Sequence, residues 1–314
     1  MYSRALLPQT TTATRNATLS TPPRDALDHP AVKRPRPPAS PLIALPVLLG
    51  LLLIAHGCHR TPTSGEPPRI ATTTSYLEAA TRDLLGDPLN ILRLAEPGTC
   101  PGHFDLRPSQ VQELRHCIAL FRFDFQSSLD ARITALGPGG PRIAEVALTS
   151  GMGHPDSYRS ACQQLANQLI DLGLLAQPES DLRLAKIEQR MEQLAQQTTQ
   201  RLHQLGWTGK PVIASTRQRD FCTWLGLRVI ATFRGADTTS FSELESALAA
   251  AKVQPVKLII ANLPEGRRTA DALAHRLHAT VVVFENFPAH RDGRLSFDDM
   301  VLANLAALEH AGSP

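Results

Sequence analysis

The chain has 314 residues, of which 42% are hydrophobic and 19% are charged, and this composition is typical of a globular protein with one large domain or two lobes. Residues 1–57 contain six Lys and Arg and two Asp and Glu residues, which leaves 26 basic and 27 acidic residues in the remainder. This balance excludes nucleic acid as an expected partner, because binding to phosphates requires a basic face.

The first 57 residues are predicted to be a leader outside the folded body. Residues 1–41 have no apolar periodicity, whereas residues 42–55 form an apolar run that suits the core of a secretory signal and is short for a transmembrane helix. The following Ala55-His56-Gly57-Cys58 resembles a bacterial lipoprotein signal. The resemblance implies cleavage before Cys58 and acylation of its thiol, with residues 58–68 as a tether. A plain cleaved signal and an uncleaved anchor are the alternatives.

Export would place the remaining cysteines in an oxidising compartment. Their even number permits one or two disulfides, and buried thiols are the alternative. The cysteines concerned are Cys100, Cys117, Cys162 and Cys222.

An N-terminal α/β lobe is predicted over residues 69–178. Short β-branched runs alternate there with helical patterns, which indicates a parallel sheet covered on both faces. The predicted strands are Ile70–Thr74, Leu89–Leu94, Ile118–Phe123 and Ile143–Leu148, and the predicted helices are Tyr76–Leu85, Ser109–Leu114 and Ser127–Leu136.

The longest helical pattern lies within residues 179–206. It begins at Ser180 or Asp181 as N-cap and stops at Gly206, with apolar residues recurring at three- and four-residue steps. At 1.5 Å per residue such a helix is roughly 38 Å long, which is enough to connect two lobes as a spine. An ordinary helix packed within one domain is the alternative.

A second α/β lobe is predicted over residues 207–314. It repeats the alternation of strands and helices seen in the first lobe. The predicted strands are Val212–Ser215, Arg228–Phe233, Lys257–Ala261 and Thr280–Phe284, and the predicted helices are Asp220–Leu225, Phe241–Ala251, Thr269–Leu277 and Phe297–Glu309.

The segment Glu96–Ser109, which reads EPGTCPGHFDLRPS, resembles the loop after the second strand in zinc and manganese solute-binding proteins of ABC transporters. In that family a Pro-Gly turn leads to a metal-binding histidine, an aromatic-acidic pair and a helix start. Further matches are Ile70–Thr74, the spine helix, Ile213–Phe221 and Val283–Pro288. The resemblance covers residues 69–311 and implies two Rossmann-like lobes, joined by one spine helix, with a metal cleft between them.

Four residues are candidate ligands of that metal: His103, His154, Gln218 and Glu285. Each follows a predicted strand, and ligands of parallel sheets collect beyond the carboxyl ends of the strands. His103 and Glu285 match the family pattern most directly, whereas His154 matches after a short shift and Ser150 matches without one. The third position departs from the pattern, because Gln218 or a water takes the place of a histidine or an acidic residue.

The sequence is therefore interpreted as an exported, lipid-anchored solute-binding protein that captures a divalent transition metal. Zinc is expected first, because imidazole and carboxylate suit it, and manganese is expected second. The expected partners are an ABC permease and its ATPase, and the chain is expected to be a monomer in the periplasm or on the outer face of the cytoplasmic membrane. No catalytic motif is found, so an enzyme is not expected. The alternatives are a protein of the same fold with a degenerate metal site, or a metallochaperone, and an exported metal-dependent hydrolase.

Overall fold

The computed structural model describes residues 69–86, 90–100, 102 and 105–312, all within the compact unit His59–Pro314. The predicted leader, the predicted acylation site Cys58 and the predicted tether lie outside the described residues. Within the described residues, no helix combines the length and the apolar character that crossing a bilayer requires.

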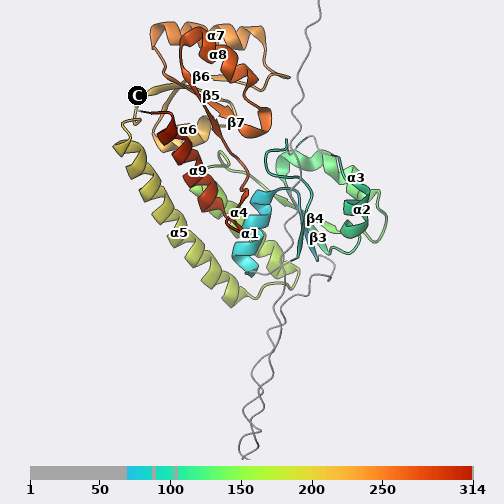
Figure 1. Cartoon of the computed structure of the whole chain (residues 1–314). Helices are drawn as coiled ribbons and strands as arrows, with labels where there is room; N and C mark the ends of the chain where they lie inside the picture. Colours follow the sequence, from blue (N-terminus) through green and yellow to red (C-terminus); the bar gives the residue numbers. More distant parts are fainter. Residues whose placement is uncertain (1–68, 87–89, 101, 103–104, 313–314) are drawn as a thin grey trace, which may run out of the picture. The chain divides into compact units, whose positions relative to one another are not determined.

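Two four-stranded parallel sheets form the framework, and both have the same strand order (Figure 1). The first sheet runs β2-β1-β3-β4 and the second runs β6-β5-β7-β8. The prediction of two parallel-sheet α/β lobes is therefore confirmed. In each sheet the strand order reverses beside the first strand of the lobe, which is where open parallel sheets bind their ligands.

The first lobe alternates strands with helices, as its sequence pattern predicts. Its elements are β1 (Ile70–Thr72), α1 (Ser75–Leu85), β2 (Ile91–Arg93), α2 (Pro108–Leu114), β3 (Ala119–Phe123), the 3₁₀ helix η1 (Asp124–Leu129), α3 (Asp130–Thr134), β4 (Arg142–Val146) and α4 (Pro155–Asp171).

The second lobe follows the long helix α5 (Gln177–Gln204) and adds a short antiparallel hairpin, β9-β10. Its elements are β5 (Pro211–Ser215), α6 (Arg219–Leu225), β6 (Arg228–Phe233), α7 (Phe241–Val253), β7 (Leu258–Asn262), the 3₁₀ helix η2 (Leu263–Glu265), α8 (Arg268–Leu277), β8 (Thr280–Phe284), β9 (His290–Arg291), β10 (Arg294–Leu295) and α9 (Phe297–His310).

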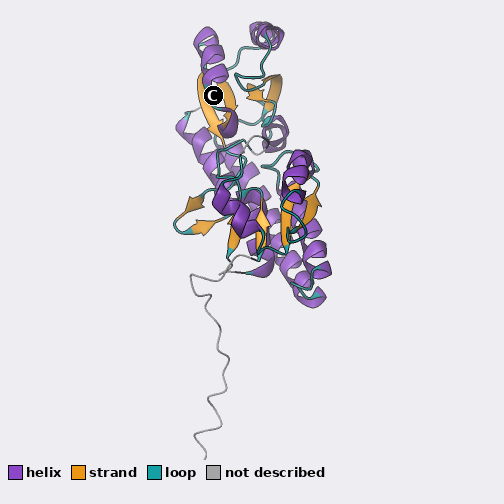
Figure 2. Ribbon diagram, turned by 90° about the vertical axis from the view of Figure 1, so that its right-hand side faces the viewer, coloured by secondary structure: helices purple, strands orange, loops and turns teal. Residues whose placement is uncertain are grey.

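The central strands β1, β3 and β7 are buried along their whole length, and Figure 2 shows helices packed beside the strands. In β5, Val212 and Ala214 belong to the largest hydrophobic cluster, whereas Ile213 between them belongs to a second cluster with α7 and α8. This alternation follows from the two-residue repeat of a strand, and it explains why apolar residues follow one another directly in β5.

The helix α5 contacts α1 and α4 of the first lobe and α6 and α9 of the second, which confirms its role as a spine. Its buried stripe is the predicted one, including Ile187, Met191 and Leu194. The predicted start was wrong: the helix begins at Gln177, with Pro178 in its first turn, and Ser180 is buried inside it. Proline is favoured at that position because its missing N–H would have no helical partner.

The two lobes share one hydrophobic core. Tyr76 of α1, Tyr158 of α4 and Phe297 of α9 contact one another through ring centroids 4.2 to 5.7 Å apart. Phe123 of β3 joins the same group against Tyr76 at 5.5 Å. Because aromatic packing of this kind stabilises one relative arrangement of the helices, large independent movement of the lobes is disfavoured.

Candidate functional site

A cleft of about 620 Å³ lies beyond the carboxyl ends of the strands, where the strand-end rule predicts a ligand site. The first lobe contributes loop residues that follow β2, β3 and β4, including Cys100, Gly102, Phe125, Ser128, Ser150 and Met152. The second lobe contributes residues that follow β5, β7 and β8, including Arg217, Asp220, Asn262, Glu265 and Asn286.

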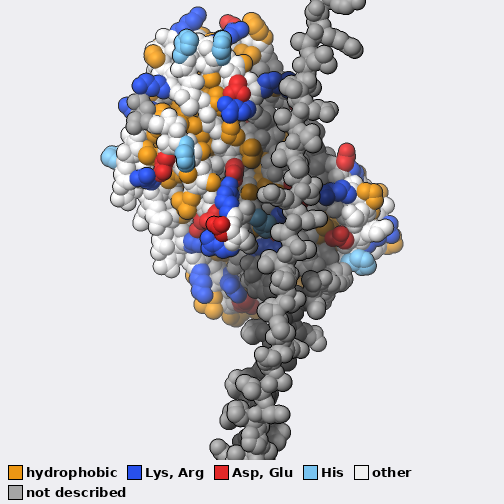
Figure 3. All heavy atoms as spheres, viewed as in Figure 1, with side chains coloured by type: hydrophobic (Ala, Val, Ile, Leu, Met, Phe, Trp, Pro, Cys, Tyr) orange, Lys and Arg blue, Asp and Glu red, His pale blue; other side chains and the backbone are white. Residues whose placement is uncertain are grey.

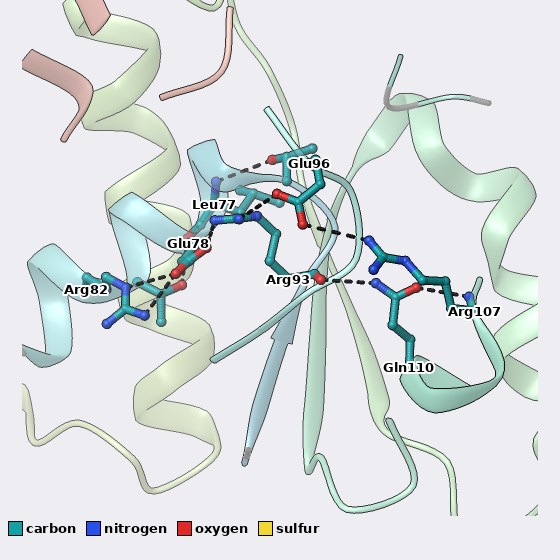
Figure 4. A network of polar contacts seen from close by, with 9 residues as sticks. Leu77, Glu78, Arg82, Arg93, Glu96, Arg107 and Gln110 are labelled. Atoms are coloured by element: carbon teal, nitrogen blue, oxygen red, sulfur yellow. Dashed lines mark hydrogen bonds and ion pairs between the residues drawn. The ribbon is translucent and has the colours of Figure 1, made fainter. Parts of the chain in front are cut away.

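His103, the leading candidate ligand, lies outside the described residues. Its described neighbours Cys100 and Gly102 line the cleft. The two ends of its loop are fixed by Gln110, whose amide donates to the carbonyls of Arg93 at 3.2 Å and Leu94 at 2.9 Å and accepts the Arg107 N–H at 3.0 Å (Figure 4). The loop that carries His103 is thus held at its base beside the cleft.

Ion pairs extend this clamp toward α1. The carboxylate of Glu96 contacts Arg93 at 2.7 Å and Arg107 at 3.7 Å, and Arg93 also reaches the buried carboxylate of Glu78 at 2.8 Å (Figure 4). Several shared charges hold their geometry better than one exposed pair does. These ion pairs therefore connect the base of the loop to α1 and β2.

His154 serves as the N-cap of α4. Its Nδ1 accepts the backbone N–H of Asp156 at 3.0 Å, and its ring lies 5.1 Å from that of Trp224. Burial lowers the pKa of His154, so the ring is neutral near pH 7. With Nδ1 accepting, the proton of the neutral ring lies on Nε2, and neither nitrogen offers a lone pair to a metal. Metal binding by His154 requires release of this cap.

Gln218 is fully buried at the start of α6, where it connects two asparagines that line the cleft. Its Nε2 donates to Oδ1 of Asn262 at 3.1 Å and to Oδ1 of Asn286 at 2.8 Å. Its Oε1 is buried without a hydrogen-bond partner among the described residues. The amide nitrogen is thus used within the protein, whereas Oε1, the atom that would bind a cation, belongs to a buried residue that does not line the cleft.

Glu285 forms a salt bridge with the hairpin that follows it. One carboxylate oxygen accepts from Arg291 at 2.5 Å, and its backbone N–H and C=O both pair with the side chain of Asn304. Glu285 does not line the cleft. Its other carboxylate oxygen, Oε2, is buried without a hydrogen-bond partner among the described residues, so the predicted role as a ligand depends on access of the metal to this oxygen.

The other carboxylates of the cleft are also engaged. Asp220 contacts Arg219 at 2.9 Å, whereas Glu265 accepts the Ser215 hydroxyl at 2.6 Å and lies 3.9 Å from Arg217. No group of three His, Cys, Asp or Glu side chains that could hold a metal occurs among the described residues. His154, Gln218 and Glu285 are absent from the described lining of the cleft, and their predicted role as ligands stays a prediction.

The cysteines form no disulfide within the part of the chain that the structure describes, so the alternative of buried thiols describes three of them. Burial raises the pKa of Cys117 to about 12 and the pKa values of Cys162 and Cys222 well above their ordinary value. These thiols stay protonated at neutral pH and are poor metal ligands. Cys100 is the cysteine that borders the cleft.

Asn262, Asn286, Arg217 and Glu265 are the site residues that sequence reasoning missed. Asn262 ends β7 and Asn286 comes two residues after β8, so both satisfied the rule that selected Gln218 and Glu285. Histidine and carboxylate are the residue types expected at a cation site, so the asparagines were not among the predicted ligands. Their signal in the sequence is a polar side chain at the carboxyl end of a strand.

The family described as "Zinc-uptake complex component A periplasmic" (ZnuA) matches residues 70–311, which is most of the chain. The chain belongs to this family. A comparison with curated protein sequences returned no match. The ZnuA family match spans both sheets, the spine helix and every described residue of the cleft.

Solved structures share the ZnuA-type fold at low sequence identity. A zinc-bound ZnuA deletion mutant has a TM-score of 0.64 at 15% identity and covers 79% of this chain and 99% of its own. A manganese-bound periplasmic metal-binding protein from Candidatus Liberibacter asiaticus has a TM-score of 0.64 at 11% identity and covers 77% and 98%. The laminin-binding protein Lbp of Streptococcus pyogenes has a TM-score of 0.63 at 17% identity and covers 79% and 99%.

Proposed function

We propose that this chain is the extracytoplasmic solute-binding component of an ABC transporter, and that it captures a divalent transition metal and delivers it to the permease and its ATPase. Zinc is the first candidate and manganese the second. The family match over residues 70–311 carries the proposal, together with a cleft at the carboxyl ends of both sheets. Binding and release suffice for this role, so no catalytic step is proposed.

The cleft supports the proposal through the loop that carries His103. Cys100 and Gly102, which precede His103 in the sequence, both line the cleft. Gln110 and Glu96 hold the base of the same loop through a hydrogen bond and an ion pair. His103 is the ligand that we propose first, because a neutral imidazole binds zinc and manganese well. His154, Gln218 and Glu285 are secondary candidates, because none of them lines the cleft, and His154 must also release its cap on α4 before it binds metal.

Attachment to the membrane belongs to the same proposal. Acylation of Cys58 would keep the protein on the outer face of the cytoplasmic membrane, close to the permease. Fractionation of cells that produce Cys58→Ser should then find the protein released from the membrane. An unchanged membrane fraction would contradict acylation and leave the metal function untouched.

Uptake of labelled zinc tests the transport role directly. Cells that lack this chain should accumulate zinc more slowly from a dilute medium than cells that produce it, and manganese should compete if both metals are carried. Identical uptake of both metals by the two strains would contradict the proposed function. It would favour a protein of the same fold with a degenerate metal site, or a metallochaperone. Turnover of phosphate or carboxylic esters by the purified protein would favour the exported hydrolase.

A further inference from the structure

Two buried asparagines expose their amide nitrogens to the cleft. Asn262 is 3% exposed and Asn286 is 5% exposed, and both line the cavity. The Oδ1 of each accepts from Gln218, whereas neither Nδ2 donates to another residue in the described part of the chain. Gln218 Oε1 is buried without a hydrogen-bond partner, whereas neither asparagine Nδ2 is a buried atom of this kind. The two N–H₂ groups therefore face the cleft.

The backbone fixes this orientation. Gln218 Nε2 lies 3.5 Å from the carbonyl oxygen of Phe284, so an amide oxygen at the same position would face the lone pairs of a second oxygen. Exchanging O and N in Gln218 would also leave a buried N–H without an acceptor, and such orphans are rarer than unpaired carbonyl oxygens. Gln218 therefore donates to both asparagines, and their nitrogens turn outward.

We name Asn262, Asn286 and Arg217 the amide wall. The side chain of Arg217 is 71% exposed, and its Nε lies 3.9 Å from Oε1 of Glu265. All three groups are hydrogen-bond donors, and a donor cannot coordinate a cation. The amide wall instead fits acceptor oxygens, which carboxylates supply at two parallel positions.

The charge and the size of the cleft narrow the class of ligand. Its described charged residues are Arg217, Arg219, Asp220 and Glu265, so their formal charges cancel. Such a lining does not favour a strongly anionic ligand such as free phosphate. A volume of about 620 Å³ suits an organic ligand, since such pockets usually enclose about 300–1,000 Å³, whereas a bare ion needs only ligands about 2 Å away.

We propose that the amide wall binds the carboxylate oxygens of a small organic acid that accompanies the metal in the cleft. The presence of a metal in the cleft rests on the proposed function. The binding of carboxylate oxygens by the amide wall does not depend on it. A metal carboxylate complex presents acceptor oxygens outward while its cation cancels most of the negative charge. It therefore matches both the donors and the near-neutral lining.

Calorimetric titration of the full-length protein tests the proposal with zinc alone, citrate alone and zinc citrate. The proposal expects zinc citrate to bind at least about tenfold more tightly than zinc alone. Equal affinity for zinc with and without citrate would overturn the amide wall and leave the metal function standing. Binding of citrate together with no binding of zinc would support the amide wall and contradict metal capture. Absence of any binding would contradict both.

Variants assign the effect to the amide wall. Asn286→Asp keeps the oxygen that accepts from Gln218 and replaces only the outward nitrogen with an acceptor. It should weaken zinc citrate binding about tenfold or more and should not weaken binding of zinc alone. Asn167→Asp, at an exposed position on α4, is the matched control and should bind zinc citrate like the parent. Equal affinity of Asn286→Asp and the parent for zinc citrate would overturn the proposal.

Gln218→Glu provides a second test that does not change the cleft lining itself. A carboxylate at this position accepts from Asn262 and Asn286, so both side chains should rotate and turn their oxygens to the cleft. Zinc citrate binding should fall, as in Asn286→Asp, although the lining residues are those of the parent. Unchanged zinc citrate binding by a folded Gln218→Glu would contradict the amide wall, and circular dichroism establishes whether the variant is folded.

Discussion

Asp83 of α1 and Arg190 of the spine helix α5 form a two-point ion pair, with Arg190 Nη1 donating to Asp83 Oδ1 at 3.0 Å and Nη2 donating to Oδ2. The Tyr158 hydroxyl of α4 donates to the same carboxylate at 2.6 Å, and Arg190 Nε lies 3.2 Å from Asp298 of α9. One guanidinium thus connects elements of both lobes, next to the shared aromatic core.

Replacing that guanidinium should destabilise the protein. Arg190→Leu leaves Asp83 and Asp298 without their counter-charge, and removal of one partner of a partly buried pair costs about 1–3 kcal/mol. Arg201→Leu removes another ion pair between α5 and α9, at the surface, and should cost much less, because solvent screens exposed charges. Urea unfolding measures both. Equal losses for the two variants would contradict the special role of Arg190.

Asp298 should make stability depend on acid pH in an unusual direction. Burial raises the pKa of this carboxyl above its ordinary value of 3.8. The folded protein therefore binds more protons than the unfolded chain just above pH 3.8, and this contribution to stability is lost as pH rises through the folded pKa. Asp298→Asn should remove that contribution. Denaturant unfolding across this pH range would contradict the assignment if parent and variant changed identically.

His154 should act through its cap on α4. His154→Asn keeps an N-cap acceptor and should retain most of the stability, whereas His154→Leu should lose about 1 kcal/mol. Because burial lowers the pKa of His154 below 6.5, the parent should lose stability as pH falls from 6.5 toward the folded pKa, and neither variant should show this loss. Thermal unfolding above and below pH 6.5 measures this. Strong loss of zinc binding in a stable His154→Asn would instead identify a ligand.

Replacement of Gly153, which lies in the loop after β4 and packs against α6, should destabilise the protein. A Cβ at this position would lie 2.6 Å from two atoms of the Phe221 ring. Gly153→Ala therefore forces the ring or the loop to shift and should cost about 1–3 kcal/mol. The control is Gly139→Ala, whose Cβ would meet nothing within 4 Å. Similar melting temperatures of the two variants would show that the contact yields easily.

The sequence predicted the two sheets well because buried parallel strands leave short continuous apolar runs such as Leu258–Ile260, which differ from the spaced apolar residues of the neighbouring helices. It did not predict α4 as an element. The buried face of α4 consists partly of Ala161, Cys162 and Ala166, whose small side chains weaken the apolar periodicity on which the prediction depends. The mixed face of α4 was therefore hard to distinguish from a loop.

The position of the site was predictable, but its bonding was not. The strand-end rule led to the correct edge of both sheets, because that edge depends on local strand direction alone. The pairing of Gln218 with Asn262 and Asn286 depends on contacts across 44 and 68 residues. Sequence spacing does not determine such contacts, and hydrogen bonds of this kind decide whether a side chain offers the cleft a donor or an acceptor.

Elemental analysis of the exported protein, purified without added metal, measures directly whether the chain captures a transition metal. We expect close to one zinc or manganese ion per chain in the parent. We expect a large loss of that metal in His103→Ala and no loss in His116→Ala, which replaces an exposed histidine before β3. A parent with no transition metal, or a His103→Ala variant with the same metal content as the parent, would contradict metal capture through His103.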